Sequence, residues 1–487
     1  MTTPDEASFG EVLGQLAAAD PDAPAITCGD VTISRSEFHR STNRLARAYE
    51  DLGVRPGSFV TIGLPNGIEF LESAFAVWKL GATPQPVSHR LPPKELAAII
   101  ELVQPSLVVG FPDDTGAGFA HVAPGFVPAA SLSDDDVPPA VAPYWKAPTS
   151  GGSTGRPKVI VAAQPATFGS VNGFGPVFGL TSDGVILTTG PMSHNGPFMS
   201  TAVSLLLGAH VVVMPRFDAA TALELVERHG VTWMYAVPTM MLRIWRLGEE
   251  RARHDLSSLR RVLHLAAPCP EWLKRAWIDW LGADTVWELY AGTEVQAITI
   301  ISGSEWLAHP GSVGRPVIGE IRVLDAELHE LPAGTVGSLW MRRGEGVASP
   351  YRYIGAEPRA IDGGWECLGD IGRVDEDGYV YLSDRDTDMI LAGGANVYPA
   401  EVEAALEEHP AVRTSCVVGL PDEDMGQVVH AVIEVVDDVS DDELRIFCAE
   451  RLAPYKLPRT FHRTSEPLRD EAGKVRRSAV RESLLPA

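Results

Sequence analysis

A chain of 487 residues, 45% of them hydrophobic, is too long for one ordinary core and predicts at least two globular domains. Its 40 basic and 64 acidic side chains give a formal net charge of −24, which argues against nucleic-acid binding, because phosphate backbones require a surplus of lysine and arginine. No apolar stretch reaches the ~18 to 20 residues that span a bilayer, so no membrane span is expected. Scattered cysteines without C-x-x-C spacing suit a reducing compartment, and we expect a cytoplasmic protein without zinc or disulfides.

Helical patterns alternate with short β-rich runs from about residue 4 to residue 110. Runs such as SFVTIGL at 58–64 and SLVVGF at 106–111 flank amphipathic stretches, and the alternation resumes from about 184 to 267. Such alternation predicts parallel β-α units. The expected fold class is therefore α/β, with residues 1–384 forming a large, layered N-terminal domain of several subdomains.

Residues 111–147 are acidic and punctuated by proline and glycine, a composition that predicts a surface connection. A second change in composition near residue 384 indicates a hinge at 385–388 and a small α+β domain over 389–487. Within this domain Pro399 suits the start of a helix, which is expected to bury one apolar face and to end before His409-Pro410.

The loop at 149–158 reads TSGGSTGRPK. Closely spaced glycines let backbone N–H groups point toward a ligand, hydroxyls add donors and the lysine adds a charge, which is typical of a phosphate site. It is not a Walker A loop, because Arg156 and Pro157 separate the last glycine from the lysine. A flexible surface linker of the same composition is the alternative. The residues assigned to phosphate are Ser150, Gly151, Gly152, Ser153, Thr154, Gly155 and Lys158.

This loop resembles the phosphate-binding loop of the adenylate-forming superfamily, which contains acyl-CoA synthetases, luciferases and the adenylation domains of peptide synthetases. Further motifs of that superfamily follow in order: YAGTE at 290–294, LGD at 368–370, DR at 384–385, GGANVYPAEVE at 393–403, LAPYK at 452–456 and GK at 473–474. The resemblance covers essentially the whole chain. It implies an ATP-dependent ligase that converts a carboxylic acid into an acyl adenylate and passes the acyl group to coenzyme A, with Mg²⁺ as metal.

For catalysis, the resemblance implies that Lys474 reaches into the large domain and neutralises the reacting carboxylate and phosphate. Thr293 would donate to the α-phosphate, and Glu294 with Thr154 would hold Mg²⁺. Because Lys474 lies beyond the hinge, the small domain is expected to be mobile, closing for adenylation and swinging away for thioester formation. From the residues alone, a solubilising lysine and a solvated loop glutamate are the alternatives.

For the nucleotide, the resemblance implies that Tyr290 supplies a flat face for adenine, that Asp370 binds the ribose with help from Arg385, and that Ala267 backs the adenine pocket. A buried core tyrosine and a surface ion pair are the alternatives for the first two. For coenzyme A, two glycines would line the channel of the thiol arm and two basic residues would meet the phosphates. These residues are Gly393, Gly394, Lys456 and Arg459.

Peptide-synthetase adenylation domains use an aspartate to bind the amino group of their substrate, but the comparable region here, PMSHNGPF at 191–198, contains no carboxylate. An α-amino acid is therefore disfavoured, because its ammonium would be buried unpaired. The implied pocket is largely apolar and predicts a hydrophobic, bulky or cyclic acid, and its motifs are most similar to the bile-acid and steroid-acid CoA ligase branch. The residues implied for the acid are His194, which could equally be structural, Asn195, Tyr235, Val237, Pro238, Met240, Ala291 and Gly292.

A few positions depart from the superfamily pattern, such as Leu368 in place of the threonine of T-G-D and Val159 in place of a glycine. None removes a named catalytic group. They leave open a protein that performs only the thioester-forming half-reaction on a supplied acyl adenylate, one that loads a carrier protein, a non-catalytic nucleotide-binding protein, and a luciferase-like oxygenase. The expected partners are thus a small carboxylic acid or acyl adenylate and CoA, and the oligomeric state, including a homo-oligomer, is left open.

Overall fold

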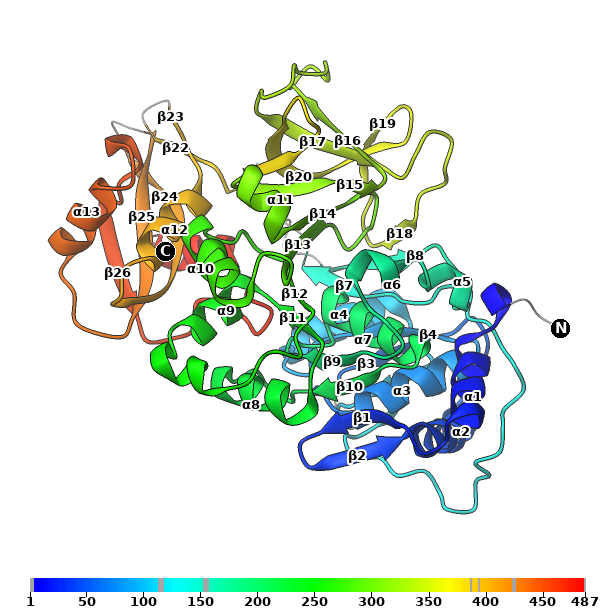
Figure 1. Cartoon of the computed structure of the whole chain (residues 1–487). Coiled ribbons are helices and arrows are strands. Elements are labelled where there is room, and N and C mark those ends of the chain that lie inside the picture. The colour runs from blue at the N-terminus through cyan, green and yellow to red at the C-terminus, as the bar shows by residue number, and fades with distance from the viewer. Residues whose placement is uncertain are drawn as a thin grey trace.

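The computed structural model describes residues 4–112, 118–151, 157–385, 388–392, 395–422 and 426–485. The chain forms a large α/β N-terminal domain and a smaller C-terminal domain, as predicted. The small domain lies beside helices α9 (Pro238–Trp245) and α10 (Glu271–Leu281) of the large domain (Figure 1). Within the described ranges, no helix is both long enough and apolar enough to cross a membrane.

The main sheet of the large domain has 14 strands, and one half of it contains the predicted parallel β-α units. These strands are short and apolar, because helices such as α7 (Asn195–Leu207) and α8 (Ala219–His229) cover the sheet. In spatial order they are β13 (Val286–Ala291), β12 (Arg261–His264), β11 (Trp233–Ala236), β9 (Val185–Thr188), β10 (His210–Val213) and β1 (Pro24–Cys28), with β2 (Val31–Ser34) antiparallel at the edge.

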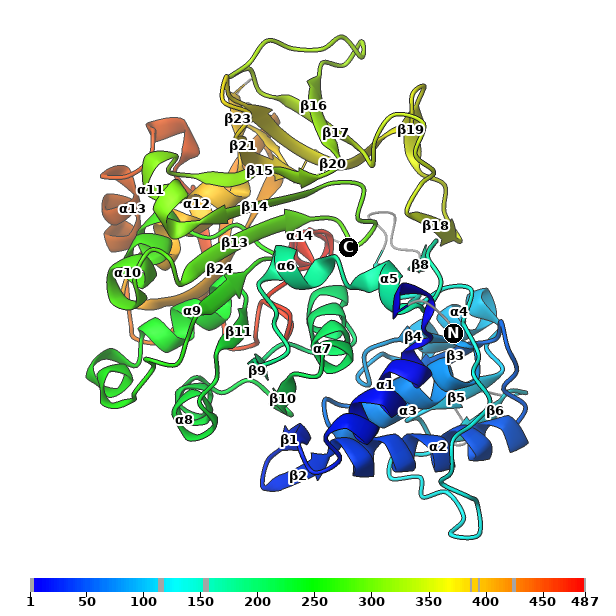
Figure 2. The same ribbon diagram turned by 45° about the vertical axis from the view of Figure 1, so that its right-hand side comes forward.

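The other half of the main sheet is antiparallel and begins where β14 (Ile298–Ser302) pairs with β13. Figure 2 shows β13, β14 and β15 in succession across this half. Its remaining elements are α11 (Gly303–Ala308), β15 (Ser312–Ile318), β21 (Val380–Arg385), β20 (Trp365–Val374), β17 (Gly337–Arg342), β16 (Glu320–Leu324) and β19 (Arg359–Ile361). This half places β20, which contains residue 370, in the same sheet as β13, which ends at residue 291.

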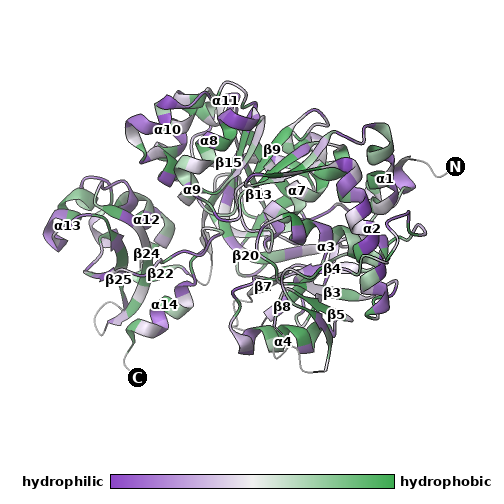
Figure 3. Cartoon of the chain, turned by 90° about the horizontal axis from the view of Figure 1, so that it is seen from below, coloured by the Kyte–Doolittle hydropathy of each residue, from purple (hydrophilic) through white to green (hydrophobic). Residues whose placement is uncertain are grey.

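Two smaller sheets complete the large domain, and Figure 3 shows β3 and β5 of the first sheet as hydrophobic strands. The first is parallel and comprises β4 (Thr83–Pro86), β3 (Phe59–Ile62), β5 (Leu107–Val109) and β6 (Ala120–Val122), with α1 (Phe9–Ala19), α2 (Arg35–Asp51), α3 (Ile68–Lys79) and α4 (Pro93–Val103). The second is antiparallel and comprises β18 (Tyr351–Ile354), β8 (Pro157–Ala162) and β7 (Thr149–Gly151), followed in the chain by α5 (Phe168–Val171) and α6 (Phe174–Phe178).

The prediction that residues 111–147 form only a surface connection is wrong at both ends of the segment. Strand β6 extends the parallel sheet beside β5. Near the other end, Trp145 and Lys146 are only 2% and 3% exposed. The indole of Trp78 donates a hydrogen bond of 2.7 Å to the carbonyl of Trp145, so core packing draws the end of the connection inside.

The small domain is a five-stranded sheet covered by helices. Its elements are β22 (Ile390–Ala392), β23 (Ala395–Val397), α12 (Pro399–Glu407), β24 (Val412–Asp422), β25 (Gly426–Val435), α13 (Asp441–Ala449), β26 (Thr460–Thr464) and α14 (Arg477–Leu484). Helix α12 confirms the predicted helix, since Val402 and Leu406 are fully buried against the sheet. The domain limits and the hinge at 385–388 stay predictions.

Candidate active site

Predicted site residues follow directly after four parallel strands that end at one edge of the main sheet. Strands β9, β11, β12 and β13 are parallel neighbours, so their carboxyl ends lie together. In open α/β sheets, ligands bind at this edge. The residues that the strands deliver there are His194 and Asn195 after β9, Val237 and Pro238 after β11, Ala267 after β12, and Gly292, Thr293 and Glu294 after β13.

Tyr290 and Asp370 meet, although 80 positions separate them in the chain. The Tyr290 hydroxyl on β13 donates a 2.6 Å hydrogen bond to Oδ2 of Asp370 on β20. Asp370 also lies opposite Arg385 in the register of β20 and β21. The structure therefore brings Tyr290 and Asp370 together and places the backbone of Arg385 beside them, three of the four residues predicted for the base and the ribose.

Lys158 and Glu294 form one polar cluster with Tyr353, which sequence reasoning missed. Lys158 Nζ lies 3.3 Å from Glu294 Oε1 and 2.9 Å from the Tyr353 hydroxyl, and that hydroxyl donates to Glu294 Oε1 at 2.5 Å. Burial and the charge of Glu294 raise the pKa of Tyr353, so this tyrosine is a hydrogen-bond donor rather than an anion. Only the pairing of β18 with β8 brings Tyr353 here, and the strand YRYI carries no sequence signal for that role.

The backbone is strained at two positions beside these residues. Val295, directly after Glu294, has φ 59°, and Ala266, directly before Ala267, has φ 77°. Both values are uncommon without glycine, and Val295 is a clear outlier because its side chain is β-branched. Such strain concentrates at binding sites, where the surrounding structure enforces it.

The loop that carries Lys474 docks at this edge against the residues that are predicted to bind the carboxylic acid. A Cβ atom at Gly473 would lie 2.5 Å from Thr239 Oγ1 and 3.1 Å from Val237 Cγ2, so the loop contacts the start of α9 closely. Burial, reinforced by the positive charge of Lys474, lowers the pKa of His194 to about 4, against the opposing charge of Asp470. Lys474, Asp470 and His194 are therefore electrostatic neighbours across the two domains.

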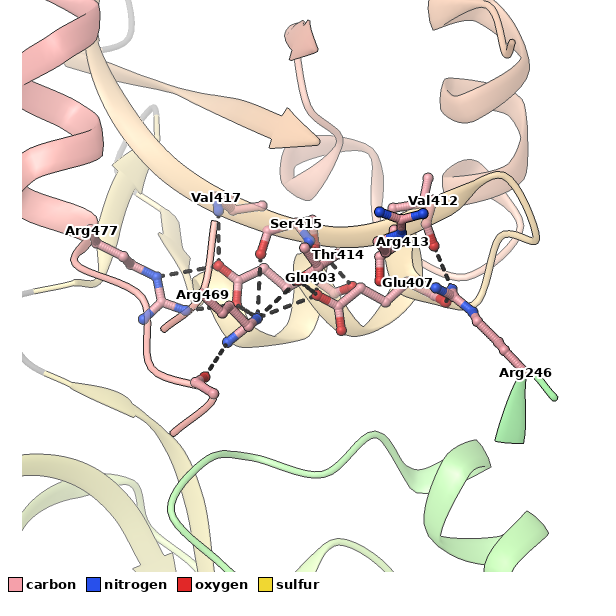
Figure 4. Close-up of polar contacts among 11 residues, drawn as sticks. Arg246, Glu403, Glu407, Val412, Arg413, Thr414, Ser415, Val417, Arg469 and Arg477 are labelled. Carbon is pink, nitrogen blue, oxygen red and sulfur yellow. Dashed lines mark hydrogen bonds and ion pairs between the residues drawn. The ribbon is translucent and has the colours of Figure 1, made fainter. Parts of the chain in front are cut away.

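Two arginines that flank Lys474 fix its loop to α12 (Figure 4). Arg477 Nη2 lies 2.7 Å from Glu403 Oε2, and Arg469 Nη2 lies 3.3 Å from the same oxygen and 3.3 Å from Glu407 Oε1. Both glutamates are buried, so the ion pairs are shielded from solvent. Sequence reasoning selected Lys474 from this region and missed the network that holds its loop.

The small domain is also held by an arginine of the large domain, at the end of α9. The Arg246 guanidinium donates to the carbonyls of Glu407, Val412 and Arg413 in the small domain (Figure 4). This arginine and Gly473 therefore stabilise the observed arrangement of the domains. Two ion pairs between the domains add to them: Arg90 with Glu471 at 2.6 Å and Glu95 with Arg476 at 3.4 Å.

The predicted wall for the acid is apolar and tightly packed. Tyr235, Val237 and Met240 are 3%, 1% and 3% exposed. The ring of Tyr235 lies so close to Gly190 and Gly196 that a Cβ atom at these positions would come within 2.9 and 3.1 Å of it. Neither glycine was singled out from the sequence, because only their approach to Tyr235 makes them necessary.

Comparisons with known proteins agree with this geometry. The model of the AMP-binding enzyme family matches residues 14–352, and that of the AMP-binding enzyme C-terminal domain matches residues 401–474. The chain belongs to the AMP-binding enzyme family. This membership confirms the predicted adenylate-forming superfamily and its enzyme class, an AMP-forming acyl-CoA synthetase with ATP, Mg²⁺ and coenzyme A as cofactors.

Relatives of this AMP-binding enzyme match it over nearly its whole length. A feruloyl-CoA synthase of Amycolatopsis sp is 31% identical over 478 residues, covering 96% of each chain. A 3-[(3aS,4S,7aS)-7a-methyl-1,5-dioxo-octahydro-1H-inden-4-yl]propanoyl:CoA ligase of Rhodococcus jostii (strain RHA1) is 30% identical, covering 94% of this chain and 95% of its own. The structure of o-succinylbenzoate CoA synthetase from Bacillus subtilis with its acyl-adenylate intermediate is 25% identical, with a TM-score of 0.85, and covers 100% of this chain and 99% of its own.

The phosphate loop of this enzyme connects the two strands of a hairpin. Strands β7 and β8 pair antiparallel, and the backbone of Ser150 lies opposite Lys158. Gly151 is the last described residue before the connection. Four residues predicted for phosphate, and two predicted for coenzyme A, lie outside the described residues: Gly152, Ser153, Thr154, Gly155, Gly393 and Gly394.

The basic residues predicted for coenzyme A lie on the small domain, each beside a carboxylate. Lys456 Nζ is 2.6 Å from Glu401 Oε1, and Arg459 Nη1 is 3.5 Å from Asp422 Oδ2. The structure does not bring them into the cluster around Tyr290 and Glu294. A role in coenzyme A binding would require them to exchange these partners for phosphate.

One carboxylate suits a magnesium ion that arrives with a nucleotide. Among the described residues, no group of three or more histidine, cysteine, aspartate or glutamate side chains could hold a metal. Mg²⁺ commonly keeps several waters and uses one or two carboxylates together with phosphate oxygens of the substrate. Glu294, 6% exposed and beside Lys158, fits that mode of binding.

Proposed function

We propose that this enzyme is an ATP-dependent carboxylic acid:CoA ligase that activates a hydrophobic, bulky or cyclic acid. The observation that supports the proposal best is the docking of the Lys474 loop against Val237 and Thr239, beside the edge that carries Thr293 and Glu294. Names of relatives agree, since they describe a feruloyl group, a succinylbenzoate and a methyl-dioxo-octahydroindenyl propanoate, all of which are cyclic acids.

In the first half-reaction, a carboxylate oxygen of the acid attacks the α-phosphorus of ATP and pyrophosphate leaves. Lys474 neutralises the approaching carboxylate and the α-phosphate, and Thr293 donates to the same phosphate. Lys158 faces the phosphates, while Tyr290 and Asp370 hold base and ribose. Glu294 would hold Mg²⁺, which would supply positive charge to the phosphate oxygens.

In the second half-reaction, the thiol of CoA attacks the acyl carbon, AMP leaves and the thiol proton is released. For this step we propose that residues 389–487 swing about a hinge at 385–388 relative to residues 1–384, which removes Lys474 from the site. The movement would break the contacts of Gly473 and Arg246. Both contacts involve few groups, as expected of an interface that opens in every cycle.

The acid pocket excludes a charged substrate amine by its composition. His194 is neutral at pH 7, because its pKa of about 4 is far below that pH. Tyr235, Val237 and Met240, which are predicted to wall the pocket, are buried and carry no charge. An α-amino acid would lose the hydration of its ammonium without gaining a carboxylate.

A substrate panel tests the proposal. With ATP, Mg²⁺ and CoA, we expect AMP and acyl-CoA to form in equal amounts from hydrophobic cyclic acids and no pyrophosphate to form with α-amino acids. Pyrophosphate release and acyl-CoA are measured separately. Turnover of a synthetic acyl adenylate without adenylation of any free acid would instead support the half-reaction alternative. Acyl transfer only to a carrier protein would support the alternative in which the enzyme loads a carrier protein.

Glu294→Gln is expected to lower the rate of adenylation roughly tenfold at limiting Mg²⁺, because the carboxylate that would hold the metal becomes a neutral amide. Binding of AMP without metal should change little, and raising Mg²⁺ should restore part of the rate. The measurements are pyrophosphate release against Mg²⁺ and calorimetric titration with AMP. Glu305→Gln, at the start of α11, is the control. An unchanged Mg²⁺ dependence would remove Glu294 from the metal site.

A further inference from the structure

A buried lysine outside the predicted machinery lies at the acid side of the site. Lys146 is 3% exposed, and its Nζ donates to Oδ1 of Asn195 on the first turn of α7. Among the described residues, the other contacts of Nζ are the Met199 sulfur at 3.6 Å and the ring of Trp145, whose centroid is 4.9 Å away. No carboxylate among the described residues lies within ion-pair distance of it.

Within the part of the chain that the structure describes, this arrangement leaves the ammonium short of acceptors. An ammonium carries three N–H donors, and thioether sulfur accepts only weakly. Burial lowers the pKa of Lys146 to about 7, against the opposing charge of Glu294. A buried lysine with one strong acceptor is costly, so a role that needs a donor at this place would explain why it is there.

The same lysine lines a cavity that reaches the proposed reaction centre. The cavity has a volume of about 60 Å³, and Lys146, Thr293, Glu294, Phe174 and Tyr351 are among its lining residues. A volume of that size holds a small substituent of a ligand or a few waters. The lining of the cavity therefore includes an ammonium together with residues proposed to handle the phosphate.

We propose that Lys146 is a substrate-recognition residue whose ammonium donates a hydrogen bond to an oxygen acceptor on the carbon skeleton of the acid, a ketone or a second carboxylate. The inference rests on the proposed function and deepens it. The acid is hydrophobic, but it carries a polar oxygen apart from the carboxylate that reacts. Asn195 orients the ammonium through its side-chain oxygen, and the apolar groups around Lys146 strengthen the bond by excluding water.

The arrangement also gives a positive reason for the exclusion of amino acids. A substrate ammonium next to Lys146 would place two like charges in one buried pocket. Lys79 provides the contrast, since this second buried lysine, 2% exposed, donates to Asn43 Oδ1 at 2.6 Å and to the carbonyl of His39 at 2.9 Å. Lys79 is satisfied by the protein, whereas Lys146 keeps donor capacity toward the cavity.

The test compares acids that differ only in the oxygen. The probes are cyclohexyl- and indanylpropanoic acids, their ring-oxo analogues and their ring-carboxy analogues, and kcat/KM for pyrophosphate release is measured with each. We expect the unmodified enzyme to prefer the best oxygenated analogue over its parent by roughly 10- to 100-fold, the scale of a hydrogen bond to a charged group. Whether the oxo or the carboxy series shows the preference identifies the acceptor.

Lys146→Met should abolish this preference while leaving kcat/KM for the parent acids within a few-fold. Lys146→Met/Asn195→Leu removes both polar partners together and provides a second test if the single variant folds poorly. The matched control is Lys79→Met, which should retain the preference. The inference would be overturned if the unmodified enzyme used the parent acids with the same kcat/KM as their oxygenated analogues. It would also be overturned if Lys146→Met kept the preference or lowered kcat/KM equally for all acids. Both outcomes would leave the proposed function intact. If no acid is adenylated at all, the proposed function itself is wrong.

Discussion

Replacing Lys474 with alanine is expected to lower the rate of acyl-adenylate formation by roughly 10²-fold or more, the usual effect of removing one preorganised charge-stabilising group. Its ammonium is a neighbour of His194 in the observed domain arrangement, where a carboxylate and a phosphate would otherwise meet without compensation. The rate is measured as pyrophosphate release at saturating ATP and acid. Thioester formation from a synthetic acyl adenylate and CoA should stay within a few-fold.

The variant is informative because Lys474 is exposed and its backbone is held separately. The Lys474 N–H donates to Asp470 Oδ1 at 2.9 Å, and the flanking arginines stay bound to α12, so the loop should keep its shape. Arg445→Ala, which removes a positive charge that pairs with Asp442 inside the small domain, is the control and should adenylate normally. Equal loss of both half-reactions in Lys474→Ala would contradict the rotating-domain mechanism.

Gly473→Val is expected to lower adenylation by roughly 10²-fold through domain docking rather than through charge. Gly473 has φ 75°, and a Cβ there would lie 2.5 Å from Thr239 Oγ1. A β-branched residue at positive φ and a steric clash cost together about 3 kcal/mol. Because the clash is with the other domain, the thioester step on a synthetic adenylate should be spared. The two half-reaction rates are the measurement.

A matched control separates backbone strain from the clash between domains. Gly426 has φ 70°, and no atom of the described residues lies within 4 Å of the position of a Cβ, so Gly426→Val imposes similar strain without a steric contact among them. It should leave adenylation nearly unchanged. Adding Thr239→Ala to Gly473→Val should restore part of the lost rate, because it removes the nearest atom. Failure of that rescue, with equal loss in the Gly426 variant, would show that docking of this loop does not limit adenylation.

The sequence determined the features that local chemistry specifies. Alternating runs predicted the parallel units, and Pro399 with the apolar face at Val402 and Leu406 predicted α12, because proline geometry and helical period act over a few residues. The motifs around 149–158, 290–294 and 473–474 predicted the family for the same reason, since each is a short, continuous string.

The tertiary structure alone decided which distant groups become partners. Tyr353 joins Lys158 and Glu294 through strand pairing, Glu403 receives Arg469 and Arg477 through the docking of a loop, and Lys146 is buried where an acidic, proline-rich connection predicted exposure. The burial and the hydrogen bonds of a residue depend on what the rest of the chain places around it, and no local sequence pattern encodes these surroundings. For Lys146 this surrounding structure turns an ordinary surface residue type into a candidate for recognising the substrate.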